Sequence, residues 1–405
     1  MDLRIRTITE DELTAFFRAT EFAFSVSPSD SEIERERRIA EPGRCIAAFD
    51  GPEIVGTAAA LTMTLTVPGG EVEIGYVTAV GVRATHRRRG VNTQLMRRQL
   101  DDARERGELV AALQASEGGI YGRFGYGLGT FALSVEIGTG RSAFVRGYAP
   151  SGEMRLVERD EGLKGILSVN DATRLVRPGM VQLDEPRLDY QLTHDHGPDK
   201  DVPPLIALHE TDGDVDGYVV YKVKHEWPEG FPRSVLTVRG LDATTPGAYA
   251  DVWRYVLDTD LMERVEAWDR PVDEPLLHLV QEPRRLRPTL HDSLWIRLVD
   301  LAGALRARRY ATDGSLVFEV VDRFCPWNGG RYAFEASDGI GAVERTDAQP
   351  DIVCTVNEVG AAYLGGTSFR RLHRARLVEE RTAGALARAD AMFAWDPTPW
   401  CPYDF

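Results

Sequence analysis

The residues best suited to chemistry in this chain lie in one arginine-rich loop. His86, Arg87, Arg88 and Arg89 follow a valine-rich segment and precede a run whose apolar residues have helical spacing. Helix N-termini carry partial positive charge and normally attract Asp or Glu, yet here four basic residues crowd that end. This arrangement favours an anion held jointly by loop N–H groups, the helix dipole and guanidinium groups.

A strand and a helix are expected on either side of this loop. Tyr76–Val82 is rich in β-branched and small residues, as strands are. A helix is expected from about Val91, and Gly107 gives it an ordinary end. The segment Leu109–Ala115 is nearly continuously apolar, which predicts a strand buried on both faces. A strand–helix–strand crossover of this kind indicates an α/β or α+β layer fold with a mixed sheet.

A glycine-rich segment follows the second strand. Residues 116–127, SEGGIYGRFGYG, hold five glycines and two tyrosines, which indicates tight turns or a close backbone approach to a ligand. The glycine spacing does not fit a dinucleotide fingerprint. Tyr121 and Tyr126 have two interpretations. Their rings pack against the glycine-rich turn, or the phenol of one of them points to the end of the Tyr76–Val82 strand and has a functional role.

Together these segments resemble the GNAT acetyltransferase superfamily. Its acetyl-CoA signature, R/Q-x-x-G-x-G/A, is matched at Arg87 and Gly90, while Asn92 replaces the final small residue. The combination of THRRRG with ASEGGIYGRFGYG resembles more specifically the enhanced intracellular survival (Eis) acetyltransferases of actinobacteria.

The resemblance implies acetyl-CoA as co-substrate, no metal, and Tyr121 as the general acid that protonates the departing thiolate. The backbone next to the loop would hold the pantetheine arm, loop N–H groups would receive the pyrophosphate, and side chains would neutralise its charge or line the channel. The residues assigned to these contacts are Val80, Val82, Arg87, Arg88, Gly90, Val91 and Ser116.

The chain ends in an aromatic, proline-stiffened tail, WDPTPWCPYDF. One interpretation is that this tail packs on the body of the protein. The resemblance implies another, in which the tail threads into the first domain and presents the α-carboxylate of Phe405 as general base. A terminal carboxylate has an ordinary pKa of about 3.5, so it would be ionised and able to accept a proton.

A chain of 405 residues exceeds one comfortable core, and two or three domains are expected. Residues 150–291 echo the first strands and crossover but lack an arginine–glycine loop. By resemblance, the fold class is α+β with mixed sheets: a catalytic GNAT domain at 1–149, a degenerate GNAT-like domain at 150–291, and a sterol-carrier-protein-like domain at 292–405 that carries the catalytic tail.

The composition excludes several classes of protein. A net charge of −15 argues against nucleic-acid binding and favours cationic partners. No apolar run reaches the roughly 20 residues that span a membrane, and no signal peptide is seen. The four cysteines are far apart, which indicates neither zinc nor disulfides and favours the cytoplasm. His194 and His196 lie in an acidic loop, where an isolated HxH rarely binds metal.

The leading hypothesis is an acetyl-CoA-dependent N-acetyltransferase for amines, which by resemblance include aminoglycosides, polyamines and lysine side chains of basic peptides. A long-chain acyltransferase is the alternative among enzymes, and a non-catalytic CoA- or lipid-binding regulatory protein is the alternative outside them. The resemblance also implies a homo-oligomer, a hexamer.

Overall fold

The computed structural model describes residues 3–145, 147–193 and 202–404. His194, His196 and Phe405 therefore lie outside the described residues. The chain folds as two compact units. The first contains residues up to Thr130 together with 292–399, and the second contains residues 131–291 together with 400–404.

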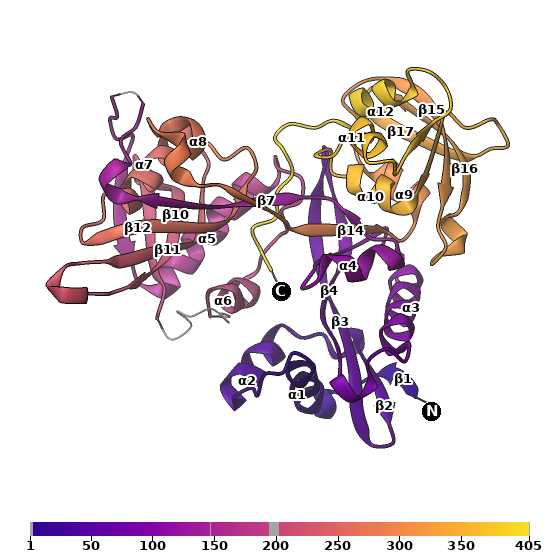
Figure 1. The fold of residues 1–405 in the computed structure, drawn as a ribbon, viewed down its shortest axis with the longest axis horizontal. Helices are drawn as coiled ribbons and strands as arrows, with labels where there is room; N and C mark the ends of the chain where they lie inside the picture. The colour runs from indigo at the N-terminus through magenta and orange to yellow at the C-terminus, as the bar shows by residue number, and fades with distance from the viewer. Residues whose placement is uncertain (1–2, 146, 194–201, 405) are drawn as a thin grey trace. The chain divides into compact units, whose positions relative to one another are not determined.

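The first unit contains a seven-stranded mixed sheet with the order β1-β2-β3-β4-β5-β14-β6 (Figure 1). Strands β4 and β5 run parallel, and α3 makes the crossover between them. The other neighbouring strands are antiparallel. The elements of this part are β1 (Arg4–Thr7), α1 (Leu13–Ala23), α2 (Asp30–Ile39), β2 (Cys45–Asp50), β3 (Glu53–Val67), β4 (Gly70–Val82), α3 (Val91–Glu105), β5 (Val110–Gln114), α4 (Gly118–Tyr121), β6 (Gly127–Leu128) and β14 (Leu294–Leu298).

Helices α1 and α3 cover opposite faces of this sheet. Successive side chains of a strand point to opposite faces. Ala47 and Phe49 of β2 accordingly pack in a cluster with α1. Ile46 and Ala48 pack instead with Leu95 of α3. Strand β2 is buried on both faces because α1 covers one face and α3 covers the other.

The same unit contains a five-stranded sheet, of order β17-β16-β15-β18-β19, with β15 and β18 parallel. An aromatic cluster fills its core, including Phe318, Phe334 and Phe393. The elements are α9 (Leu301–Ala307), β15 (Gly314–Val321), β16 (Gly330–Ser337), β17 (Ile340–Arg345), β18 (Ile352–Thr355), α10 (Val356–Ala362), α11 (Phe369–Arg374), β19 (Glu379–Glu380) and α12 (Ala385–Phe393).

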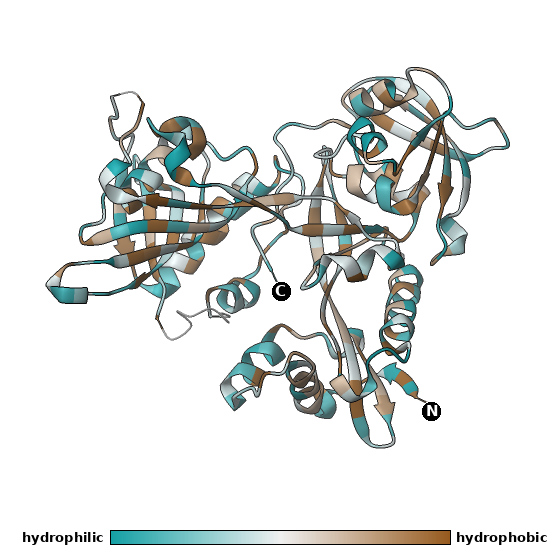
Figure 2. Cartoon of the chain, viewed as in Figure 1, coloured by the Kyte–Doolittle hydropathy of each residue, from teal (hydrophilic) through white to brown (hydrophobic). Residues whose placement is uncertain are grey.

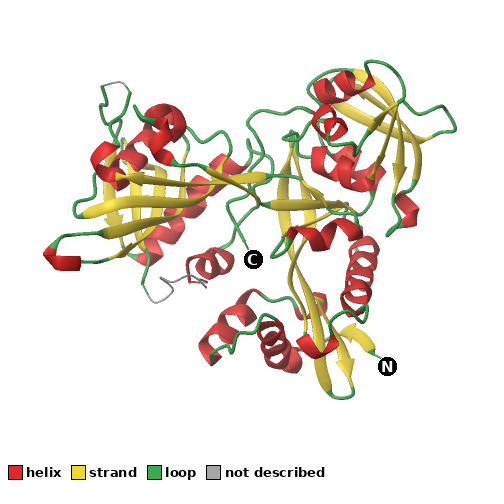
Figure 3. Ribbon diagram, viewed as in Figure 1, coloured by secondary structure: helices red, strands yellow, loops and turns green. Residues whose placement is uncertain are grey.

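The second unit is built on a seven-stranded sheet of order β13-β7-β12-β11-β10-β9-β8. Helices α5 and α7 lie against it (Figure 3), and hydrophobic residues run along β10 to β12 (Figure 2). Trp253 of α7 is fully buried in the hydrophobic core of this unit. The parallel pair β11 and β12, joined by α7, repeats the crossover of the first sheet. The elements are β7 (Phe131–Gly138), β8 (Glu153–Val157), α5 (Arg159–Arg174), α6 (Glu185–Thr193), β9 (Leu205–Thr211), β10 (Asp214–Lys224), β11 (Ser234–Ala243), α7 (Pro246–Leu257), β12 (Met262–Pro271), α8 (Leu276–Leu279) and β13 (Thr289–Asp292).

The fold confirms the expected α+β class with mixed sheets, but strand pairing divides the chain differently from the expected boundaries at 149/150 and 291/292. Strand β7 pairs with β12, so residues 131–138 belong to the second sheet. Strand β14 pairs with β5, so residues 294–298 complete the first sheet and do not join the C-terminal domain. The sequence Pro150-Ser151-Gly152, which suggests the boundary at 149/150, marks a turn, but it does not show which sheet the flanking strands join.

The packing of α3 predicts that Leu95→Ala destabilises the protein. Leu95 is fully buried, so its truncation removes apolar contacts and leaves a cavity, at a cost of about 2–5 kcal/mol in free energy of unfolding. Denaturant unfolding of the full chain measures this change. Gln94→Ala, at the exposed neighbouring position, is the control and should change the free energy by less than about 0.5 kcal/mol. Equal effects of both substitutions would contradict the packing described.

Candidate active site

The two parallel strands at the centre of the first sheet separate before they end. Strand β4 pairs with β5 from Ile74, opposite Val110, to Tyr76, opposite Ala112. Beyond Tyr76, β4 continues for several residues to Val82 without further pairing to β5. Backbone groups on that side of β4 therefore lie outside the ladder with β5.

A bulge reinforces this separation. Thr78 and Gly81 pair with β3, but the register shifts between them, and Ala79 has a left-handed φ of 52°. Val80 falls inside the bulge and is paired in register with neither β3 nor β5. The predicted backbone contact at Val80 thus lies on a part of β4 where the regular pairing is interrupted.

Helix α3 begins with a bare N-terminus. Gly90 is its N-cap in a left-handed conformation with a φ of 80°, no side chain caps the helix, and its first turn holds no acid. Arg88, two residues earlier, also has a positive φ of 61°. The N–H groups of a helix's first turn have no intrahelical acceptor. This end of α3 can therefore bind an anion, with the dipole adding to the attraction.

The arginine side chains divide into two kinds. Arg87 donates from Nη2 to the carbonyl oxygen of Ala23 at 2.7 Å and from Nε to that of Val82 at 3.3 Å. Its guanidinium thus ties the loop to the end of α1, a structural use that the sequence analysis did not foresee. Arg88 is exposed.

Asn92, where the sequence departs from the superfamily signature, places a buried acceptor at the same helix end. Its Oδ1 has no hydrogen-bond partner among the described residues. A buried acceptor without a donor is costly, so such a group is usually satisfied by water or a ligand. Sequence reasoning treated this position only as a missing small residue.

Tyr121 ends the short helix α4, which follows β5. It is 5% exposed and makes edge-to-face contacts with Phe124 and Tyr126, at centroid distances of 6.5 and 5.8 Å. Burial raises the pKa of Tyr121 to about 12, so the phenol remains protonated at neutral pH and can serve as a proton donor. Ser116 is exposed at the carboxyl end of β5. Because parallel strands end at the same edge of a sheet, the segment carrying Ser116 and Tyr121 and the arginine loop share that edge.

The described part of the tail has a fixed place on the second unit. The Trp400 N–H donates to the carbonyl oxygen of Pro178 at 2.9 Å, and its indole Nε1 donates to that of Asp269 at 2.6 Å. The Asn170 amide donates to the Tyr403 hydroxyl at 2.9 Å. Residues 400–404 are thus anchored at both ends, whereas the role of Phe405 stays a prediction.

Family comparisons match three parts of the chain. An acetyltransferase (GNAT) domain family matches residues 4–129, a second acetyltransferase (GNAT) domain family matches residues 179–298, and a sterol carrier protein domain family matches residues 301–402. The first match contains the diverging strands, the arginine loop and Tyr121.

The chain is 33% identical to N-acetyltransferase Eis of Mycobacterium tuberculosis, over 88% of this chain and 87% of that protein. The chain belongs to the Eis family of GNAT N-acetyltransferases. An uncharacterized N-acetyltransferase of Streptomyces avermitilis is 40% identical over the whole of both chains. The crystal structure of Eis1 from Mycobacterium abscessus is 34% identical, covers the whole of both chains and superposes with a TM-score of 0.85.

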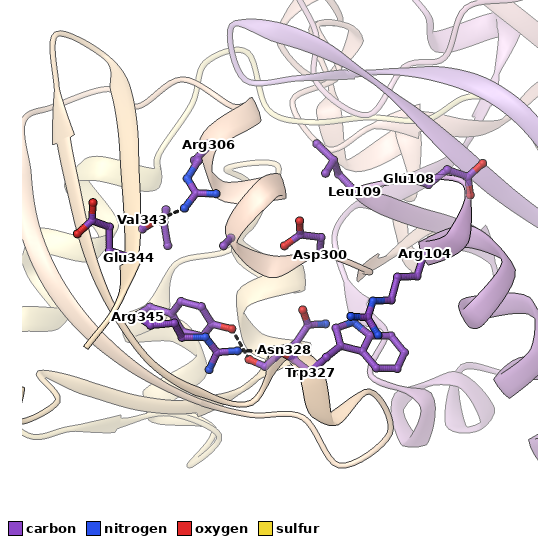
Figure 4. A pocket seen from close by; sticks show the side chains of 13 residues that line it. Arg104, Glu108, Leu109, Asp300, Arg306, Trp327, Asn328, Val343, Glu344 and Arg345 are labelled. Carbon is purple, nitrogen blue, oxygen red and sulfur yellow. Dashed lines mark hydrogen bonds between the residues drawn. The ribbon is translucent and has the colours of Figure 1, made fainter. Parts of the chain in front are cut away.

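A cavity of about 410 Å³ in this Eis-family enzyme is distinct from the loop site (Figure 4). It lies at the C-terminal end of α3, whose 15 residues put its two ends about 22 Å apart. Three of the charged groups that line it have partners within the protein. Arg345 donates to the Trp327 carbonyl oxygen at 2.7 Å, Arg306 donates to that of Val343, and Glu108 pairs with buried Arg44 at 2.6 Å. These three groups are therefore used within the fold.

The uncapped start of α3 predicts that Thr93→Glu separates helix stability from cofactor binding. A carboxylate in the first turn should stabilise the helix by about 0.3–1 kcal/mol. The same charge should repel a bound pyrophosphate and raise the Kd for CoA roughly tenfold. Calorimetric titration with CoA and thermal unfolding give the two quantities. Thr93→Gln is the uncharged control, and unchanged CoA affinity in Thr93→Glu would place the anion elsewhere.

The tail contact predicts a local effect of Gly179→Ala. Gly179 has a φ of 95°, and a Cβ there would lie 2.7 Å from the carbonyl oxygen of Trp400. The substitution should loosen the tail and speed its removal by carboxypeptidase, followed by mass spectrometry. Gly213→Ala is the matched control, because Gly213 has a φ of 91° but nothing within 4 Å of its added Cβ. Equal digestion of the two variants would show that the tail is not held at Gly179.

Proposed function

We propose that this Eis-family enzyme transfers the acetyl group of acetyl-CoA directly to amines, with Tyr121 as general acid and the α-carboxylate of Phe405 as general base. The observation that carries the proposal is a buried, protonated phenol at the sheet edge where β4 and β5 separate. The same edge carries the uncapped start of α3. These two observations support the proposal, because thioester aminolysis needs an acid for the departing thiolate and acetyl-CoA carries a pyrophosphate anion.

The cofactor would be held mostly by backbone. The N–H groups of Arg88, Gly90 and Val91 are proposed to receive the pyrophosphate, and the exposed Arg88 side chain to neutralise it. The backbone of Val80 and Val82 would pair with the pantetheine arm, and Ser116 would line the channel. Arg87 contributes charge to the loop, but its hydrogen bonds to Ala23 and Val82 make it first an anchor of that loop.

The carboxylate of Phe405 takes one proton from the acceptor's ammonium group, and the free amine attacks the thioester carbon. A C–N bond forms and the C–S bond breaks, and Tyr121 gives its proton to the departing thiolate. The nitrogen of the new amide, which still carries one proton too many, gives it up to solvent. Solvent returns a proton to the phenolate, and the carboxyl group of Phe405 releases its proton before the next turnover. The raised pKa of Tyr121 keeps the phenol protonated at neutral pH.

The acceptor is proposed to be a cationic amine, such as an aminoglycoside, a polyamine or a lysine side chain. The net charge of −15 steers cations toward the protein. Phe22 and Phe24, at the end of α1 where Arg87 is anchored, are each 49% exposed and offer aromatic faces to such a cation. We place the enzyme in the cytoplasm, where its four free, buried cysteines stay reduced, and propose a homohexamer. No helix among the described residues is long and apolar enough to cross a membrane.

Thiol release with acetyl-CoA tests the proposal, using tobramycin, spermidine and a lysine peptide as acceptors and myristoyl-CoA as the competing donor. Acetyl transfer is expected, and Tyr121→Phe should lower kcat by about a hundredfold or more. One residue added after Phe405 should lower it as well. Tyr126→Phe is the matched control, because its buried hydroxyl has no hydrogen-bond partner among the described residues.

Full-rate transfer by Tyr121→Phe would remove this residue from the mechanism. Turnover of myristoyl-CoA in place of acetyl-CoA would favour the long-chain acyltransferase, and no turnover with any amine would favour the binding protein.

A further inference from the structure

One side chain of the C-terminal domain holds the turn that follows Tyr121. Asn357, in the first turn of α10, donates from Nδ2 to the carbonyl oxygen of Gly122 at 2.7 Å and to that of Tyr126 at 2.8 Å. Its Oδ1 accepts a hydrogen bond from the hydroxyl of Thr355 at 3.0 Å, so the oxygen of the side-chain amide has a partner as well. Both N–H groups of one amide thus close the turn at its two ends.

The backbones of the two domains also meet directly at this point. A Cβ on Gly127 would lie 1.8 Å from the carbonyl oxygen of Asn357 and 2.6 Å from the amide nitrogen of Ala361. A Cβ on Gly360 would lie 2.7 Å from the carbonyl oxygen of Ile296. These distances leave no room for side chains, so β6 is seated on α10 and cannot shift away without losing its contacts.

Aromatic and charged contacts from the loop that carries Phe324 also support this turn. Phe324 packs on Phe124 at a centroid distance of 5.1 Å. The loop that carries Phe324 is held by Asp322, which accepts a hydrogen bond from the N–H of Cys325 at 2.8 Å and pairs with buried Arg297 at 2.7 Å. Phe124 in turn packs on Tyr121. The C-terminal domain therefore constrains both sides of the segment that bears the phenol.

We propose that Asn357 is a positioning residue for the general acid, so that the sterol-carrier-like domain of this enzyme serves as the support of its catalytic tyrosine. The inference rests on the proposed role of Tyr121. Proton donation depends on placement, and a displacement of about 1 Å can cost roughly a hundredfold in rate. Asn357 does not touch the reacting atoms. It acts by holding the carbonyl groups on either side of the turn next to Tyr121.

A double-mutant cycle in the full chain tests this inference. Asn357→Asp keeps the shape of the side chain but removes both donors, and kcat should fall roughly ten- to hundredfold while KM for acetyl-CoA stays within about twofold. In a Tyr121→Phe background the same substitution should cause no further fall beyond about twofold, because the group it positions is gone. A merely structural role would lower kcat in both backgrounds.

Glu358→Gln is the matched control, since it changes the adjacent residue of α10 and keeps an acceptor for the Thr355 N–H. It should retain the wild-type kcat. Thermal unfolding checks that each variant is folded. If Asn357→Asp does not fold, Asn357→Ala, which removes the donors without adding charge, takes its place in the cycle.

The outcomes separate the two proposals. If Tyr121→Phe is slow but Asn357→Asp has the wild-type rate, or if the two losses multiply, Asn357 does not act through Tyr121 and the inference is overturned, while the role of Tyr121 stands. If Tyr121→Phe keeps the full rate, its role as acid fails and the inference fails with it.

Discussion

The site depends on the loss of pairing between β4 and β5 beyond Tyr76. Backbone N–H and C=O groups seldom remain without partners, so a strand that leaves its neighbour needs another one. The far side of β4 stays bound to β3, and α1 and α3 clamp the sheet from its two faces. The separation of β4 from β5 is thus built into the sheet, and the arginine loop and the glycine-rich turn lie beside it because they follow these two strands.

The second unit repeats this topology with a different helix start. Strands β11 and β12 with α7 repeat the crossover, but Thr245 caps α7 through its side chain and Pro246 occupies the first turn. The first turn of α3 has no side-chain cap, whereas the first turn of α7 has one. Two copies of one topology thus differ in the chemistry of the helix start.

Local patterns in the sequence predicted the local structure well. The strand, loop and helix around residues 76–107 and the buried strand after them were all confirmed, because periodicity and capping act over a few residues. The domain boundaries depend instead on which sheet β7 and β14 join. Arg87 meets a carbonyl group 64 positions away, and Asn357 meets one 235 positions away. Nothing in the sequence around Asn357 distinguishes it from an ordinary residue in the first turn of a helix.

The place of β14 also has a consequence for synthesis of the chain. Strand β5 pairs on one side with β14, whose Ile296 lies opposite Ala112. The ribosome must therefore add more than 180 residues before the first sheet receives that strand, and until then an apolar strand edge is exposed to other chains. Late closure of a non-local pair slows folding and favours aggregation. The nascent enzyme thus has a defined interval in which a chaperone is useful, and a fragment ending at residue 130 would remain in that state.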